Sequence, residues 1–321
     1  MRLAKEVTKE AKTMKKEDID AQIEKSKYPL RKYYRNVLDF IENKCAVKSE
    51  EHRDKVNAGK VCPGIGFDLD KPIESPRHLF GKIFFTEAFF GFLWTEINWL
   101  YTSFEKVYVK KNNAMYFGKD IEFTPELKKE VERAYELFNW GRTLREKYSE
   151  WPTELLDFSK EDCSWLSKIT NIWIRAIGFI FYHEYAHAIG IKDEKEADQN
   201  AIYNVCLYDN PDETEIVTNV LGAVGAWVSL FFLIDNPGLI EQGDHPDLDD
   251  RLNDLIKAVE PKLSEDKVAY LKMFCSIAVN MFCKINGLSN EVGKPGKDEN
   301  EIWQSVLVSC QEIKKSFKSD N

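Results

Sequence analysis

The 321-residue sequence predicts a mainly α-helical protein with a small β-hairpin or sheet, an α+β fold. Two observations predict this class. Apolar residues recur at helical spacing in most of the long segments. Only residues 104–123 combine strand-forming side chains with turn residues in the way that is typical of paired strands. With 43% hydrophobic and 13% aromatic residues, a chain of this length can bury a sizeable core.

The N-terminal part differs in composition from the rest of the chain. Residues 6–23 are rich in Lys and Glu, which is typical of a solvated helix or a partly ordered arm. The apolar residues from Tyr28 to Asn43 then have helical periodicity. Loop-forming Pro and Gly residues follow between positions 62 and 76. We therefore expect an N-terminal helical segment at 1–75 and one larger domain at 76–321.

The segments that follow this boundary are aromatic. Leu79–Tyr101 has helical spacing and is expected to be a core helix. Phe104–Val109 and Met115–Phe123 resemble paired strands, either a surface hairpin or a sheet edge that binds an extended peptide. A helix with Pro at its first position is expected from Thr124 to about Tyr148.

The run from Ile216 to Ile234 carries no charge and is long enough to cross a membrane. Polar residues such as Thr218 and Asn219 interrupt it, and no Lys or Arg flanks it. We favour a buried core helix, and a membrane span is the alternative. Helices are also expected at 259–282 and 302–317.

Residues 183–187 read His-Glu-Tyr-Ala-His, an HExxH pattern in a chain with only five histidines. On a helix, His183 and His187 share a face, so both imidazoles can reach one metal ion. Glu184 can then contact a metal-bound water. Zn²⁺ suits two His and one carboxylate, with a fourth position open to water. The alternative is two solvated histidines on an ordinary helix.

A second short segment, residues 194–198, reads Glu-Lys-Glu-Ala-Asp. Gly190 is expected to end the first helix and Asp193 to cap the second. Glu194 then lies in the first turn and is the predicted third ligand. Asp198 lies one turn later on the same face, where it would accept the outer N–H of a ligating His and hold its tautomer.

The pattern HExxH followed by E-x-x-A-D resembles the gluzincin metallopeptidases, in which the first Glu of the second segment is the third zinc ligand. Residues 245–252 are similar to the HPPxxxRL segment of the HtpX and CAAX-prenyl endopeptidase group, with Asp247 in place of the second Pro. In length the chain looks more like the phage-exclusion (Lit-type) peptidases of bacteria. The resemblance covers residues 173–252 and implies a zincin-like core.

The resemblance also implies roles for two residues far from HExxH. His245 would face the scissile carbonyl and donate a hydrogen bond to the oxyanion. Arg251 would anchor its loop to a carboxylate. The alternative for His245 is a surface or helix-capping residue, and Tyr185 and Tyr203 are weaker candidate donors.

Together these residues predict a zinc-dependent endopeptidase in which Glu184 takes the water proton and later delivers it to the leaving amine. The phage-exclusion resemblance implies cleavage of one host protein during infection. A membrane-associated, HtpX-like quality-control protease is one alternative. A non-catalytic zinc-binding sensing module is another.

The composition limits which partners and which cellular compartment are expected for this protein. A net charge of −9 argues against nucleic acid held on a basic surface. Seven scattered cysteines without CxxC indicate free thiols, and the charged N-terminus does not look like a secretory signal. We expect a cytoplasmic protein with a protein or peptide substrate. Membrane association is not favoured, and the oligomeric state stays open.

Overall fold

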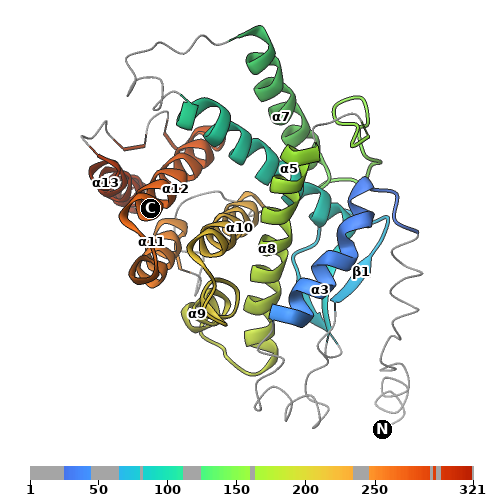
Figure 1. Ribbon diagram of the computed structural model, residues 1–321, viewed down its shortest axis with the longest axis horizontal. Coiled ribbons are helices and arrows are strands. Elements are labelled where there is room, and N and C mark those ends of the chain that lie inside the picture. The colour runs from blue at the N-terminus through green and yellow to red at the C-terminus, as the bar shows by residue number, and fades with distance from the viewer. Residues whose placement is uncertain are drawn as a thin grey trace.

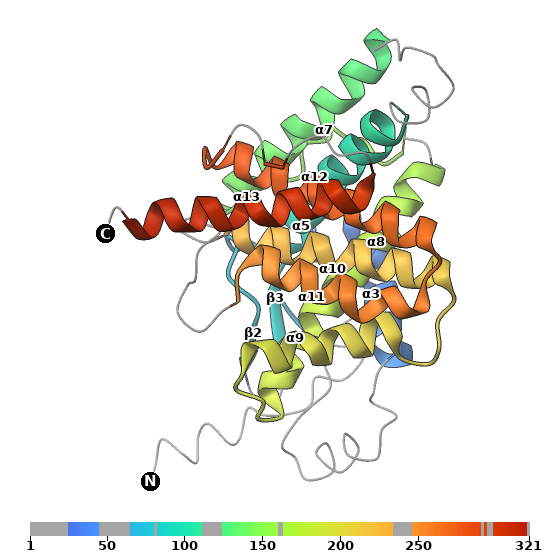
Figure 2. The ribbon, with the colours of Figure 1, turned by 90° about the vertical axis from the view of Figure 1, so that its left-hand side faces the viewer.

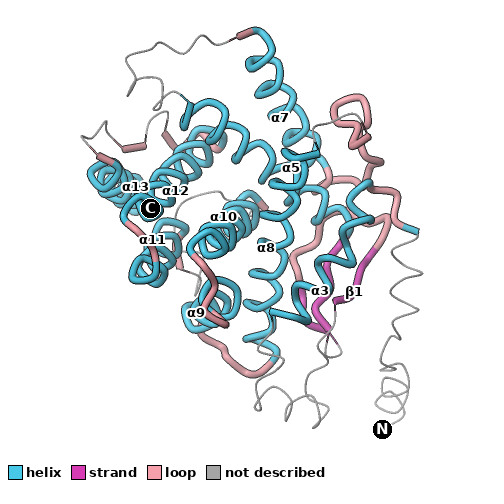
Figure 3. The backbone as a smooth tube through the Cα atoms, in the orientation of Figure 1, coloured by secondary structure: helices cyan, strands magenta, loops and turns pink. Residues whose placement is uncertain are grey.

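The structure, a computed structural model, describes residues 25–44, 65–79, 82–110, 124–159, 163–233, 246–289, 292–293 and 298–319. These residues are mainly helical, with one small sheet, which confirms the predicted α+β class (Figure 1, Figure 3). The helices are α3 (Tyr34–Lys44), α5 (Glu87–Thr102), α7 (Pro125–Thr143), α8 (Cys163–Ala188), α9 (Glu194–Ile202), α10 (Glu213–Phe232), α11 (Leu248–Val259), α12 (Glu265–Ile285) and α13 (Glu299–Ser319).

Helix α8 runs through the centre of the molecule. The sheet and α3 lie on one side of it, and α9 to α13 lie on the other (Figure 1). The indole of Trp173 in α8 donates a hydrogen bond to the Phe90 carbonyl of α5 at 3.0 Å. A Cβ atom added to Gly222 of α10 would lie 2.6 Å from Arg175 Cβ, so α8 and α10 pack in close contact. The helix that carries HExxH is therefore held by neighbours on several sides.

The sheet consists of β1 (Ile65–Asp68), β2 (Arg77–Leu79) and β3 (Lys82–Thr86). β3 lies in the middle, parallel to β1 and antiparallel to β2. Ile83 and Phe85 are buried while Phe84 between them is partly exposed, so one face of β3 packs into the core. Both β2 and β3 pack against α8.

The first of the two predicted strands was wrong. Phe104–Val109 is helical, because Ser103–Val109 continues α5 as a π-helical segment. Phe104 and Tyr108, four residues apart, stack on one face of this segment, and Phe104 packs on Tyr270 and Phe274 of α12. That spacing is helical, and packing outweighs the strand-like composition. Met115–Phe123 lies outside the described residues.

The helix expected from Leu79 begins only at Glu87, because the preceding residues form β3. Thr86 caps it, accepting a hydrogen bond from the Phe89 amide at 3.1 Å. α7 begins at Pro125 as expected but ends at Thr143. The boundary expected between residues 75 and 76 falls between β1 and β2 of one sheet, and the two-part organisation stays a prediction.

By length and composition, α10 and α12 are long and apolar enough to cross a membrane, among the residues that the structure describes. Most of the apolar part of α10 is buried, and just over half of that of α12. α10 packs against α8, α5 and α12. In this fold its apolar side chains are mostly buried among other helices, and the choice against a membrane span stays a prediction.

Candidate metal centre

The candidate metal centre begins where α8 ends. Gly190 has a φ of +102°, a conformation that L side chains rarely adopt. Its amide bonds to the His187 carbonyl, and the Ile191 amide bonds to the Ala186 carbonyl, both at 3.0 Å. These two bonds form a Schellman motif, so Gly190 is the predicted helix stop. The reversed chain brings the Ile191 carbonyl to 2.8 Å from His187 Nδ1.

α9 begins three residues after this turn. Asp193 is its N-cap, and its side chain accepts a hydrogen bond from the Glu196 amide at 2.9 Å, as predicted. Ala197 is fully buried, and its small side chain lets α9 pack closely on α8. Glu194 in the first turn and Asp198 one turn later both face the HExxH histidines.

Three predicted ligands meet at one point. His183 Nε2 and His187 Nε2 are 3.2 Å apart. Each of them lies 3.2 Å from a carboxylate oxygen of Glu194, His183 from Oε2 and His187 from Oε1. In a tetrahedral zinc site with bonds of about 2.0–2.1 Å, neighbouring ligand atoms are roughly 3.3–3.4 Å apart. The three side chains are therefore spaced to hold an ion of this kind.

The outer nitrogens of the two histidines lie within hydrogen-bond distance of acceptor oxygens. His183 Nδ1 lies 2.9 Å from Asp198 Oδ1, and His187 Nδ1 faces the Ile191 carbonyl. Each Nδ1 therefore carries the proton in the neutral ring, which leaves the Nε2 lone pair as donor to a metal. Two such lone pairs and a carboxylate repel one another at this spacing unless a cation lies among them. The chemistry of the donor set thus fits a metal ion.

Arg251 of α11 connects the two carboxylates. Its guanidinium lies 3.3 Å from Asp198 Oδ1 through Nη1 and 3.6 Å from Glu194 Oε2 through Nη2. Its Nε donates to the Pro246 carbonyl at 3.1 Å. The side chains of Arg251 and Asp198 are only 6% and 7% exposed. Arg251 thus connects the start of α11 to both carboxylates.

The electrostatics of the centre favour a cation. Burial lowers the pKa of His183, but hydrogen bonds with Asp198 and Glu194 outweigh burial and raise that pKa to about 9. Glu184 adds a third carboxylate, and burial raises its pKa against the opposing effect of the two histidines. With one guanidinium against three carboxylates, the site holds positive charge strongly, as a proton or as a metal ion.

The candidate oxyanion donors are not all visible. His245 lies outside the described residues, although Pro246 immediately after it is half-buried beside Arg251. Tyr185 is 5% exposed and stacks on Phe181. Tyr203 is 56% exposed and contacts Tyr208.

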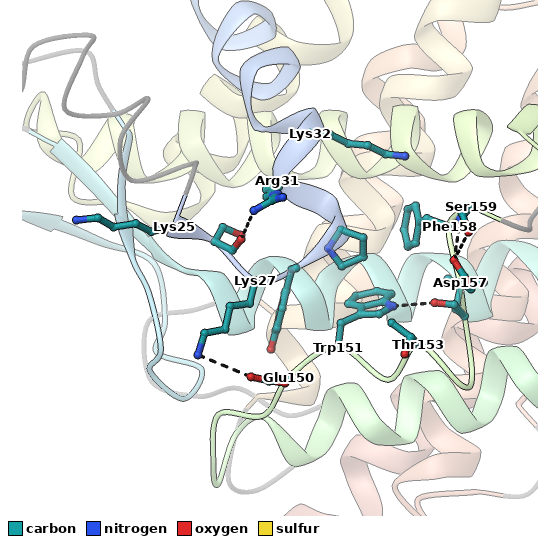
Figure 4. A pocket seen from close by; sticks show the side chains of 14 residues that line it. Lys25, Lys27, Arg31, Lys32, Glu150, Trp151, Thr153, Asp157, Phe158 and Ser159 are labelled. Atoms are coloured by element: carbon teal, nitrogen blue, oxygen red, sulfur yellow. Dashed lines mark hydrogen bonds and ion pairs between the residues drawn. The ribbon is translucent and has the colours of Figure 1, made fainter.

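The metal centre is separate from a surface cavity of about 860 Å³ that sequence reasoning did not find (Figure 4). Its lining residues come from the segments 25–32 and 150–159, and none of the candidate metal-centre residues is among them. Lys27 lies 3.8 Å from Glu150 and 3.4 Å from Asp70, so part of its charge is balanced. We assign this cavity no role in catalysis.

The comparisons with known proteins give one match. A sequence model of the Peptidase U49 family matches residues 83–273, which is more than half of the chain. A search of curated proteins and a search of solved structures each returned no significant match. The matched region runs from β3 into α12 and contains HExxH, Glu194, Asp198, His245 and Arg251. The chain therefore belongs to the Peptidase U49 family, the Lit-type peptidases.

Proposed function

We propose that this peptidase is a zinc-dependent endopeptidase in which His183, His187 and Glu194 hold one Zn²⁺. The observation that carries the proposal is the convergence of two Nε2 atoms and one carboxylate with 3.2 Å separations. Glu184, beside the first ligand on the same helix, is the proposed general base. A structural zinc site would have no use for this carboxylate, which argues against a non-catalytic sensing module.

Zinc bound here would polarise a peptide carbonyl and lower the pKa of a water molecule. Glu184 would accept a proton from that water and deliver it to the leaving amine. Burial raises the pKa of the Glu184 carboxyl, which suits a group that must hold a proton between the two steps. Asp198 and the Ile191 carbonyl hold the two rings in the required tautomer, and Arg251 holds Asp198.

Asp198→Ala is expected to weaken zinc affinity by about 10–100-fold with the fold intact, because His183 loses the group that orients it. Chelator competition measures the affinity and circular dichroism the fold. Asp254→Ala is the matched control, since Asp254 of α11 pairs with Lys195 of α9 at 3.0 Å without contacting the centre. Equal zinc affinities in the two variants would remove Asp198 from the centre.

His245→Ala is expected to lower kcat by about 10²–10³-fold at near-normal KM and full zinc occupancy, because one oxyanion donor is lost. The alternative, a helix-capping role before α11, predicts near-normal turnover with a melting point lowered by loss of about 1 kcal/mol of stability. Kinetics and a thermal melt on this one variant separate the two roles.

We further propose that the enzyme acts in the cytoplasm on one host protein, as the resemblance to phage-exclusion peptidases implies. The buried position of α10 supports a fold that needs no bilayer. Recovery of the protein only from membranes, in detergent, would favour the quality-control alternative.

The experiment that tests the function compares bacteria expressing the wild type with bacteria expressing Glu184→Gln. New protein termini that occur only with the wild type identify the substrate and the cleaved bond. Identical sets of termini in both cultures, with and without phage infection, would contradict the proposed endopeptidase.

A further inference from the structure

A second buried charge cluster lies at the start of α11, on the side facing the C-terminal helix. Lys314 of α13 places its Nζ 2.7 Å from Asp247 Oδ2, 2.5 Å from Asp249 Oδ1 and 3.5 Å from Asp250 Oδ2. The side chain of Lys314 is only 14% exposed and that of Asp249 only 2%. One ammonium thus balances three carboxylates that lie within 4.8 Å of one another.

The same turn of α11 carries Arg251. The Arg251 amide donates to the Asp247 carbonyl at 3.0 Å, the first hydrogen bond of the helix, and its Nε donates to the Pro246 carbonyl. Arg251 cannot keep its place if this turn opens. Its guanidinium reaches Asp198, which lies against His183, and Glu194.

Removal of the ammonium would set three carboxylates against one another in a single turn. Like charges at this spacing repel, and the nearly inaccessible Asp249 would keep an uncompensated charge or take up a proton. In either case the turn that positions Arg251 loses the ammonium that holds Asp247 and Asp249 to α13. Charge at one end of α11 is thereby coupled to the geometry of the metal ligands. Figure 2 shows α13 lying along the outside of α12, near α11.

We propose that Lys314 is a positioning residue for the metal centre, acting through the first turn of α11 on Arg251 and so on Asp198 and Glu194. This inference rests on the proposed function, because it assumes that zinc binds at the centre. Lys314 lies beyond residues 83–273, so the family match does not include it. The C-terminal helix would then be needed for tight metal binding.

The test compares zinc affinity, by chelator competition, in the wild type, Lys314→Met and Lys272→Met. Lys272 of α12 is a close control, because its side chain is also mostly buried, at 13% exposed. It contacts Glu260, which follows the far end of α11, and Asn300 of α13. Both variants should melt at lower temperature than the wild type. Only Lys314→Met should weaken zinc binding. We expect a loss of about tenfold in affinity, the lower end of the range seen when a residue that hydrogen-bonds to a metal ligand is replaced.

Two further variants secure the interpretation. Lys314→Arg keeps the charge and should bind zinc nearly as well as the wild type. Asp247→Asn weakens the same contact with a residue that still favours the N-cap position, so it should weaken zinc binding even if Lys314→Met does not fold. Normal zinc affinity in Asp247→Asn would contradict the proposal.

A double-mutant cycle tests the route through Arg251. In an Arg251→Met background, Lys314→Met should change zinc affinity by less than about twofold, because the two effects share one path. Additive effects would contradict the route. If the wild type binds no zinc, the proposed function fails. If the wild type binds zinc and Lys314→Met matches Lys272→Met, only the role of Lys314 fails.

Discussion

Replacing Glu184 by Gln is expected to lower turnover by about 10²–10⁴-fold, the range of general acid–base catalysis, at unchanged zinc content. Gln has nearly the same shape as Glu but cannot accept the water proton. Since Glu184 is not among the three converging ligand side chains, the metal should stay bound. Elemental analysis and single-turnover kinetics on the identified substrate measure the two quantities on one sample.

Glu196→Gln is the matched control for this experiment. Glu196 lies in the first turn of α9, two residues after Glu194, with its side chain exposed to solvent. Its replacement should leave both turnover and zinc unchanged. Comparable turnover in the two Gln variants would exclude Glu184 as the general base.

Replacing His187 by Ala is expected to abolish stoichiometric zinc binding, and Glu194→Ala should reduce it strongly. Each variant removes one of only three protein ligands, and a metal with a fourth, open position has no substitute for the lost side chain. His187 also takes its ring orientation from the Gly190 turn, so the histidine is preorganised for the ion. Protein purified without chelator and analysed for metal gives the stoichiometry.

Glu196→Ala again serves as the control and should keep the wild-type zinc content. Both ligand variants should still fold, because the fold is stabilised mainly by buried apolar side chains, many of them on α8 and α10, which these substitutions leave unchanged. Full zinc content in His187→Ala would show that the ion is held elsewhere.

The convergence of the three proposed ligand side chains was predictable from the sequence because its geometry is local. The spacing of His183 and His187 needs only a helix, and Gly190 and Asp193 mark where that helix ends and the next begins. Glu194 and Asp198 then follow from one helical turn. Every step spans fewer than ten residues, so little depended on tertiary structure.

The sequence did not predict the sheet at its actual position, because the central strand is short and lies within a longer segment of helical spacing. Lys82–Thr86 is only five residues long, and its three central residues are all apolar, within an aromatic run that otherwise has helical spacing. Its pairing partner, Ile65–Asp68, is far enough away that only the folded chain brings the two together. An apolar run this short can belong to a buried strand or to a buried helix, and its sequence does not distinguish the two.

Lys314 was missed for a related reason. It lies on an amphipathic helix where lysine is ordinary, and nothing around it forms a motif. Asp247 and Asp249 look like common first-turn acids of a helix. Their shared contact with one ammonium appears only when α13 packs beside α11 and α12. Long-range ion pairs of this kind leave no periodicity to detect.

The most direct test of the central claim is anomalous diffraction at the zinc edge from crystals of the wild-type protein. We expect one anomalous peak in the described part of the chain, bounded by His183 Nε2, His187 Nε2 and the Glu194 carboxylate. A peak at the Asp247, Asp249 and Asp250 cluster instead, or no peak from zinc-replete protein, would contradict the metal centre proposed here.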